Sequence, residues 1–228
     1  SCVINDRFFT AEDCVFINNH ADSYGGAVSV WNGSSRVDIT DCVMEGNTAG
    51  LGGGAVIAYN CHVYLDGCTF YDNRADEKGS VAHVHNDATM DFWECTVSEN
   101  GRNDFIFSSI GTTVLNLERT VVSFNTSVLF DLSPSTTGLV GCCNIFGNGG
   151  GDALPAGLGD AGRNLSEDPL FCGVRGSHNY YLTSVSPCWP SNRPDGLWCA
   201  VIGAWSVGCG STAVESRSWG GIKALHRD

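Results

Sequence analysis

The side chains best suited to chemistry occur between residues 72 and 91. His83 and His85 lie two residues apart on a predicted strand, so both point to one face at a spacing that metal ligands use. A pair of ligands defines a metal site poorly, and a packed or exposed pair is the competing interpretation. Calcium could also bind between acidic turns such as Asp72 and Asp76. The repetitive Gly-Gly-x-Gly-x-Asp calcium loop is missing from the sequence, so we expect no cofactor, and Ca²⁺ at the acidic turns is the alternative.

A second candidate is the pair Arg102 and Asp104, which we expect beside Asp76, Glu77 and Lys78 of the preceding repeat. A carboxylate with a basic neighbour could hold calcium and abstract a proton, as a polysaccharide lyase does. Surface ion pairs are common and weak, so a solvated turn is the alternative interpretation. Neither Arg102 nor Asp104 recurs in a second repeat, which argues against a catalytic site.

Four C-terminal cysteines are predicted to form disulfides: Cys172, Cys188, Cys199 and Cys209. They lie in loop-rich sequence, where bridges stabilise a module with a small core, and they permit three pairings. Their spacings of 16, 11 and 10 residues do not resemble the short Cys-x-x-Cys motifs of structural zinc. Cys2, Cys61 and the pair Cys142-Cys143 could belong either to this group or to the repeats described next.

The elements that must position these groups form a repeat of 23 to 28 residues. One recurring position is occupied by Cys14, Cys42, Cys68, Cys95, Thr120 and Cys143. The residue five places later is always asparagine: Asn19, Asn47, Asn73, Asn100, Asn125 and Asn148. Each repeat also carries three short runs with a period of two, which indicates strands. A repeat of this length, without helical pattern, predicts an all-β, right-handed parallel β-helix of six to seven coils.

The two recurring positions are expected to stack into ladders. A column of inward cysteines is small and apolar and fills a narrow core. The asparagines occupy a turn, where each amide can bond to the amides above and below. We assign residues 1–163 to the coils, 164–210 to a closing coil or cap, and 211–228 to a linker and tail.

Several of these residues resemble known repeats. Phe16-Ile17-Asn18-Asn19 with Gly25-Gly26-Ala27-Val28, and Phe70-Tyr71-Asp72-Asn73, resemble the FxxN and GGA(I/L/V) repeats of polymorphic outer-membrane proteins and related secreted bacterial β-helix proteins. Asp168-Pro169-Leu170-Phe171, Ser186-Pro187-Cys188 and Ile202-Gly203-Ala204 resemble the closing module of such proteins. The resemblance implies the fold and an extracellular or cell-surface location. It does not single out one function, because such coils serve adhesins and carbohydrate-active enzymes alike.

The net charge and the apolar content of the chain argue against several kinds of partner. The net charge of −13 argues against nucleic acid and anionic lipid as partners, and no apolar run is long enough to span a membrane. The chain opens inside a coil at Ser1, so either upstream residues have been removed or a second subunit covers this coil. The basic C-terminal tail carries apolar residues at intervals of three, namely Trp219, Ile222 and Leu225. This tail could dock on a neighbour, serve in sorting, or pack on the cap.

Three function classes remain open. The first is a non-enzymatic structural or adhesive surface protein, which could self-associate head to tail through its coil ends or tail into a fibre. The second is a polysaccharide lyase or glycoside hydrolase, but the clusters expected of such enzymes on this fold are missing. The third is passive carbohydrate binding, with polysaccharide or a cell surface as partner, through Trp31, Tyr59, Tyr64 and Trp93. Sequons begin at Asn32, Asn125 and Asn164 and matter only in a glycosylating host.

Overall fold

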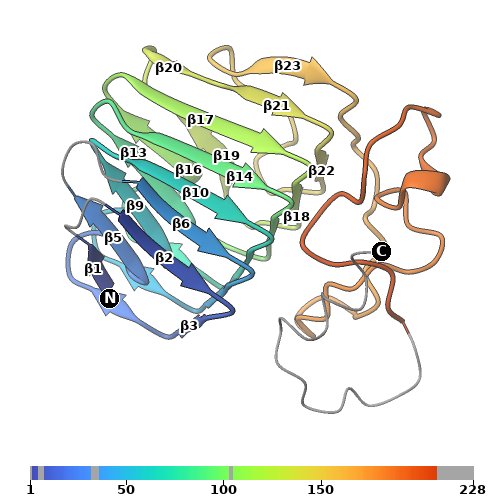
Figure 1. Ribbon diagram of the computed structural model, residues 1–228, viewed down its shortest axis with the longest axis horizontal. Coiled ribbons are helices and arrows are strands. Elements are labelled where there is room, and N and C mark those ends of the chain that lie inside the picture. Colours follow the sequence, from blue (N-terminus) through green and yellow to red (C-terminus); the bar gives the residue numbers. More distant parts are fainter. Residues whose placement is uncertain (1, 5–7, 32–35, 103–104, 210–228) are drawn as a thin grey trace.

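A computed structural model describes residues 2–4, 8–31, 36–102 and 105–209. Within these ranges the chain forms a parallel β-solenoid in which every turn contributes one strand to each of three long sheets (Figure 1). Helical structure in this part of the chain is limited to one 3-10 turn, Pro190–Asn192. The expected all-β parallel β-helix is therefore confirmed.

Three long sheets and one short sheet make up the solenoid. Sheet A contains β1 (Cys2–Ile4), β5 (Val28–Trp31), β9 (Val56–Tyr59), β13 (Ala82–His85), β16 (Phe105–Ile110) and β19 (Val128–Asp131). Sheet B contains β2 (Phe8–Glu12), β6 (Arg36–Thr40), β10 (His62–Asp66), β14 (Thr89–Trp93), β17 (Thr113–Glu118), β21 (Leu139–Gly141) and β23 (Gly159–Gly162), with β20 (Thr136–Thr137) also paired to β17. Sheet C contains β3 (Val15–Ile17), β7 (Val43–Glu45), β11 (Thr69–Tyr71), β15 (Thr96–Ser98), β18 (Val121–Ser123) and β22 (Asn144–Phe146). Sheet D contains β4 (His20–Ala21), β8 (Thr48–Ala49) and β12 (Arg74–Ala75).

The solenoid has about 5 complete turns, slightly fewer than the six to seven coils expected. Sheets A and C contain six strands each, so five full turns separate their first and last strands, and residues after Asn148 add only β23 to sheet B. Equivalent residues lie in register from turn to turn, for example Val63 between Val37 and Met90. Alternation along the strands sends every second side chain inward, and these apolar side chains form one continuous core.

The asparagines at the recurring turn position form a hydrogen-bonded ladder. The side-chain amide of each donates to Oδ1 of the next, at 2.9 Å from Asn19 to Asn47 and 3.0 Å from Asn47 to Asn73. The ladder continues through Asn100, Asn125 and Asn148 at 3.0, 3.1 and 2.9 Å. Oδ1 of Asp152 accepts the amide of Asn148 at 2.8 Å and ends the column. These bonds satisfy side chains that are otherwise buried, which explains why no other residue type occupies the position.

The cysteine column lies at the preceding turn. The thiols of Cys42, Cys68, Cys95 and Cys143 are free and buried, whereas Cys14 at the open end is exposed. Thr120 takes the equivalent place in its turn, where its hydroxyl accepts the N–H of Cys95 at 3.2 Å. Burial raises the pKa of the Cys143 thiol to about 12, so this core thiol is protonated and unreactive at neutral pH.

The glycine pairs let successive corners approach each other. Gly25 and Gly53 have φ values of 67° and 66°, in the left-handed region. A Cβ on Gly26 would lie 2.1 Å from the carbonyl oxygen of Gly54 in the next turn. The first glycine of the pair therefore adopts the left-handed turn, and the second leaves room for a backbone of the next turn that a Cβ would meet too closely.

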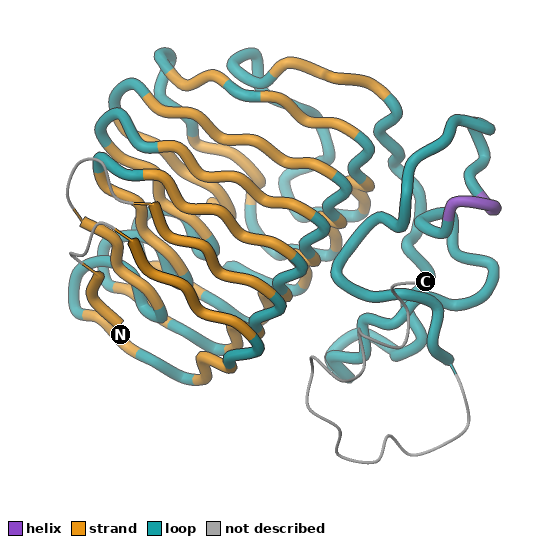
Figure 2. The backbone as a smooth tube through the Cα atoms, in the orientation of Figure 1, coloured by secondary structure: helices purple, strands orange, loops and turns teal. Residues whose placement is uncertain are grey.

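Residues 164–209 run beside the solenoid and make few regular elements (Figure 2). Instead of only closing the last coil, this cap lies along the outer face of sheet C. The N–H of Ala204 donates to Oγ1 of Thr96 at 3.0 Å, and the indole of Trp205 donates to Oγ1 of Thr69 at 2.9 Å. These outward residues of sheet C are small or apolar, so they need a cover that outward residues of sheet B do not.

The disulfides correct one sequence-based prediction. Cys172 pairs with Cys209 within the cap, and Cys199 pairs with Cys142 of the last coil. Cys188, which we expected to be bridged, is a free and fully buried thiol. Its sulfur accepts a hydrogen bond from the amide of Asn144 at 3.1 Å, so it is a packed core residue of the cap. Sequence spacing could not reveal this, because Cys142 comes next to Cys199 only when the cap folds back.

Candidate functional site

The site with the most varied side chains lies where the cap meets one edge of sheet C. It begins from a column of turn residues that immediately precede the asparagine ladder. Asp72, Glu99 and Phe124 occupy this column with φ values of 54°, 59° and 55°. Left-handed backbone is uncommon for glutamate and phenylalanine, and it turns all three side chains outward in one row.

A loop of the cap, residues 172–181, docks on this row; we refer to it as the cap loop. Its two ends are paired, with the N–H of Cys172 donating to the carbonyl of Tyr181 at 2.7 Å and that of Gly173 to Asn179 at 3.2 Å. The disulfide from Cys172 to Cys209 secures its base. The base of the loop is therefore fixed by contacts within the cap, independently of the contacts with the solenoid.

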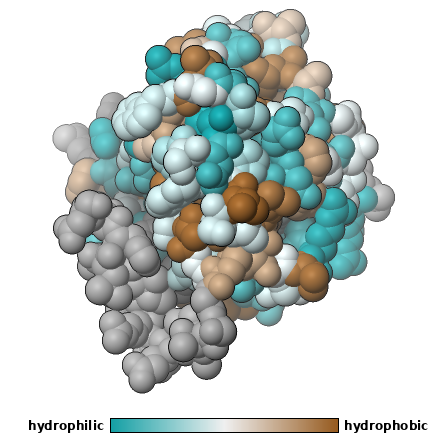
Figure 3. All heavy atoms as spheres, turned by 90° about the vertical axis from the view of Figure 1, so that its right-hand side faces the viewer, coloured by the Kyte–Doolittle hydropathy of each residue, from teal (hydrophilic) through white to brown (hydrophobic). Residues whose placement is uncertain are grey.

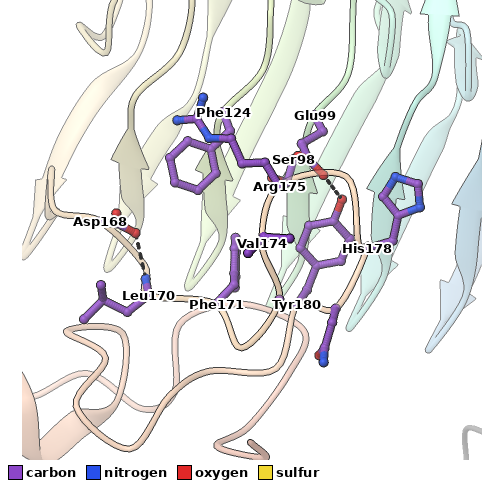
Figure 4. A pocket seen from close by; sticks show the side chains of 12 residues that line it. Ser98, Glu99, Phe124, Asp168, Leu170, Phe171, Val174, Arg175, His178 and Tyr180 are labelled. Atoms are coloured by element: carbon purple, nitrogen blue, oxygen red, sulfur yellow. Dashed lines mark hydrogen bonds between the residues drawn. The ribbon is translucent and has the colours of Figure 1, made fainter.

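Each residue of the row has a partner in the cap loop, and Figure 4 shows the partners of Glu99 and Phe124. The hydroxyl of Tyr180 donates to Oε2 of Glu99 at 3.0 Å, and the N–H of Gly176 donates to its Oε1 at 2.7 Å. Nε2 of His178 lies 3.1 Å from Oδ2 of Asp72. The guanidinium of Arg175 lies 4.0 Å from the ring centroid of Phe124. The row and the loop therefore recognise each other residue by residue.

A cavity of about 220 Å³ lies between the cap loop and the solenoid. Its walls are aromatic or apolar at Phe124, Phe171 and Val174, and polar groups enter from Asp168 and Asn179. Phe171 stands edge-on to Tyr180 at 5.2 Å between ring centroids. The cavity therefore offers both an apolar surface and hydrogen-bonding groups, as small-ligand sites do.

The hydroxyl of Tyr180 stays protonated in the docked loop. Burial, together with the neighbouring Glu99 carboxylate, raises the pKa of Tyr180 far above its ordinary value. Tyr180 therefore remains a hydrogen-bond donor across the physiological pH range, and its hydrogen bond to Glu99 is retained there.

The predicted histidine pair does not form a metal site among the described residues. His83 is buried beneath the ring of Tyr24, stacked at 5.8 Å, and its Nδ1 lies 2.7 Å from the hydroxyl of Ser108. His85 stacks on Tyr59 at 5.0 Å. In the ranges that the structure describes, no group of three potential metal ligands comes together. The two rings are packing elements of sheet A.

Two residues of the second candidate, Asp76 and Lys78, form ion pairs with residues outside it. Asp76 pairs with Arg74 at 2.7 Å, and Lys78 lies 3.9 Å from Asp131. Arg102 is exposed, and Asp104 lies outside the described residues. The proposed partner of Asp76 in calcium binding, Asp72, belongs to the row under the cap loop.

The aromatic residues singled out for sugar stacking contact neighbouring aromatic or arginine side chains. The rings of Trp31 and Tyr59 lie 5.1 Å apart at a tilt of 31°, and Tyr59 in turn stacks on His85. Arg36 lies over Tyr64 at 5.8 Å, and Arg119 over Trp93 at 4.5 Å. These contacts occupy part of each ring surface, and sugar stacking at these residues stays a prediction.

The sequon asparagines and the tail residues either have structural roles or lie outside the described ranges. The sequon asparagine Asn125 is buried in the ladder, and Oδ1 of Asn164 accepts the N–H of Cys143 at 2.9 Å. Asn32 and the tail residues Trp219, Ile222 and Leu225 lie outside the described residues. The row under the cap loop was missed, although its signal was available as the residue before each recurring asparagine.

The motif residues themselves are mostly buried. Phe70 and Asn73 of the second FxxN motif are fully enclosed, as are Ala27 and Val28 of the first GGA(I/L/V) motif. These residues therefore build the coil and its corner, and surfaces that contact partners must be sought on the residues between them.

Comparison with known proteins agrees with this architecture. Residues 13–30 match the model of the Chlamydia polymorphic membrane protein repeat. Comparison with curated proteins and with solved structures gave no match for this chain. No helix among the described residues is both long and apolar enough to cross a membrane. The repeat match and the solenoid together make this a β-helix repeat protein similar to the polymorphic outer-membrane proteins.

Proposed function

We propose that this β-helix repeat protein acts at a bacterial cell surface as a non-enzymatic, adhesive module. The observation that carries the proposal is the repeat at residues 13–30, whose family is described as a membrane protein of Chlamydia. The solenoid supports it physically, because stacked coils present long, rigid faces on which a partner can be contacted at many points. Rigid surfaces bind with little ordering cost.

The face formed by the cap is the best-suited contact surface. It carries apolar side chains among polar ones (Figure 3). Val174 and Val185 of the cap are 82% and 69% exposed, far more than apolar residues of the core. The disulfides to Cys142 and within the cap fix the backbone on which they stand. Exposed apolar groups on a fixed backbone favour a protein or cell-surface partner.

A binding assay on cells tests the proposal. The labelled protein, in its oxidised form, is expected to bind saturably to at least one of several cultured cell types. The reduced and alkylated protein is expected to bind less, because its cap is released. Saturable binding that is equal for the oxidised and the reduced protein would show that the coils, and not the cap, contact the cells. No saturable binding to any cell type would contradict adhesion.

Self-association through the coil ends is the finer part of the proposal. Phe8, Val15 and Ile17 of the first described turn are 63%, 49% and 49% exposed, on strands whose far edge has no partner among the described residues. A second copy could pair with this edge in the same parallel register. Light scattering on the oxidised protein, with Val15→Lys as the disrupting variant, tests this. A monomer at all concentrations would contradict self-association and leave adhesion untouched.

A further inference from the structure

Arg175 is a cation that has no anionic partner in the part of this strongly acidic chain that the structure describes. The sequence has 25 acidic residues against 12 lysines and arginines. Four other arginines pair with carboxylates: Arg36, Arg74, Arg119 and Arg193. Arg175 makes no ion pair or side-chain hydrogen bond with any described residue, and its contact is with the ring of Phe124. Stacking uses the face of a guanidinium and leaves its N–H groups free at the edge.

Two carboxylates line the cavity, those of Glu99 and Asp168, and neither forms an ion pair with Arg175. Both oxygens of Glu99 accept hydrogen bonds, from Tyr180 and from the backbone of Gly176. Oδ1 of Asp168 accepts the N–H of Leu170 at 2.9 Å. The N–H groups of the guanidinium are therefore available to an anion supplied by a ligand, and a carboxylate would meet them as a bidentate pair.

The rest of the cavity fits a small hydroxylated ring. Its volume of about 220 Å³ suits a single ring better than a long chain. Phe171 and Val174 supply apolar surface against which the C–H face of a ring can pack. Oδ2 of Asp168 and Nδ2 of Asn179 have no partner among the described residues, so the first can accept from a hydroxyl and the second can donate to one. Oδ1 of Asn179 accepts the N–H of Tyr181 at 3.4 Å.

A peptide carboxylate fits less well. Peptide termini are bound by free backbone N–H groups, and here the N–H groups of Leu170 and Gly176 already donate to Asp168 and Glu99. The unused groups are side chains whose donors and acceptors match hydroxyls. The observations therefore favour a sugar ring over a peptide.

We propose that this cavity binds the carboxylate-bearing ring of an acidic sugar. Arg175 holds the carboxylate, Phe171 and Val174 contact the ring, and Asp168 and Asn179 bond its hydroxyls. This inference rests on the proposed adhesive function and names the partner chemistry of the cap face, namely a glycan that carries uronic or sialic acid.

Titration of the ¹⁵N-labelled, oxidised protein by NMR tests the inference. The probes are sodium D-glucuronate, D-galacturonate and N-acetylneuraminate, with D-glucose, D-galactose and sodium acetate as controls. We expect saturable shifts around residues 168–180 with at least one acidic sugar and at least tenfold weaker binding of the controls. Arg175→Gln, which keeps much of the packing, should weaken the acidic sugar at least tenfold. Arg102→Gln removes the same charge from an exposed position outside the cavity and should change nothing.

Several results would overturn the inference. These are no saturable shift with any acidic sugar, equal binding of neutral sugars or acetate, or equal binding by Arg175→Gln. Saturation by hippurate in place of the sugars would make the cavity a peptide-carboxylate site. Thermal unfolding of each variant confirms that it is folded, and Arg175→Met, which also removes the charge and keeps a long side chain, serves if Arg175→Gln is not. Cell binding measured on the same samples separates the two proposals: adhesion without acidic-sugar binding removes this inference alone, and the reverse removes adhesion alone.

Discussion

The hydroxyl of Tyr180 donates a hydrogen bond to Oε2 of Glu99 at 3.0 Å, across a sequence separation of 81 residues. This bond joins the cap loop to a left-handed turn of the solenoid. It shows how the cap is recognised: the loop bonds to side chains that the turn column directs outward, and not to the sheet edge. The site therefore depends on the conformation of the turns as much as on their residues.

Removal of the Glu99 carboxylate should release the cap loop. In Glu99→Ala, the buried hydroxyl of Tyr180 and the N–H of Gly176 lose their acceptor, at a cost of about 1–3 kcal/mol. We expect faster amide hydrogen exchange across residues 172–181, with exchange in the strands of sheets A and B unchanged. Glu77→Ala, at an exposed position with no cap contact, is the matched control. Unchanged exchange in the loop would contradict the docking role of Glu99.

Acid should destabilise the fold through His83. Burial, with smaller effects of His85 and Lys78, lowers the pKa of His83 from 6.5 to about 4. The unfolded chain binds this proton more readily, so the stability that neutral His83 provides is full above about pH 6.5 and is lost as the pH falls towards 4. The loss amounts to about 3 kcal/mol at most.

Urea unfolding between pH 4 and 7.5 measures this dependence. His83→Gln should flatten the pH dependence across that window. His20→Gln, whose side chain is 63% exposed, should retain the wild-type slope. An equal slope in both variants would assign the acid sensitivity to other groups.

The asparagine ladder should be most sensitive at its middle. Asn73→Ala removes Oδ1, which accepts from the backbone and side chain of Asn47, and the amide that donates to the carbonyl of Met44. Because these groups are buried, we expect a loss of about 3 kcal/mol or more in unfolding free energy. Asn19→Ala at the half-buried end of the ladder should cost less than about 1 kcal/mol. The unfolding midpoint in urea compares the two, and equal losses would contradict a cooperative ladder.

Disulfide mapping should separate the cap cysteines into bridged and free. Peptide mass spectrometry of the oxidised, denatured protein is expected to show Cys142 linked to Cys199 and Cys172 linked to Cys209, with Cys188 alkylated. Cys199→Ser should lower the unfolding free energy by about 2–5 kcal/mol, because the bridge closes a long loop. Cys188→Ala should leave both bridges intact. A bridge that includes Cys188 would contradict the cap packing described above.

The recurring positions made the solenoid predictable. Stacked coils repeat one environment, so Asn73 and Asn100 carry the same residue for the same reason, and the period is visible in one sequence. The cap was less predictable, because its contacts have no period. Cys142 and Cys199 are 57 residues apart, and nothing local marks them as partners.

The sequence by itself determined the coil: its strands, its ladder of asparagines and its column of core thiols, all of which depend on short-range spacing. Tertiary structure alone decided the site, because the cap folds back along sheet C and brings Arg175 and Tyr180 to Phe124 and Glu99. The physical reason is that a ladder is fixed by neighbours one turn away, whereas the cap position follows from burying the outer face of sheet C, which no local pattern encodes.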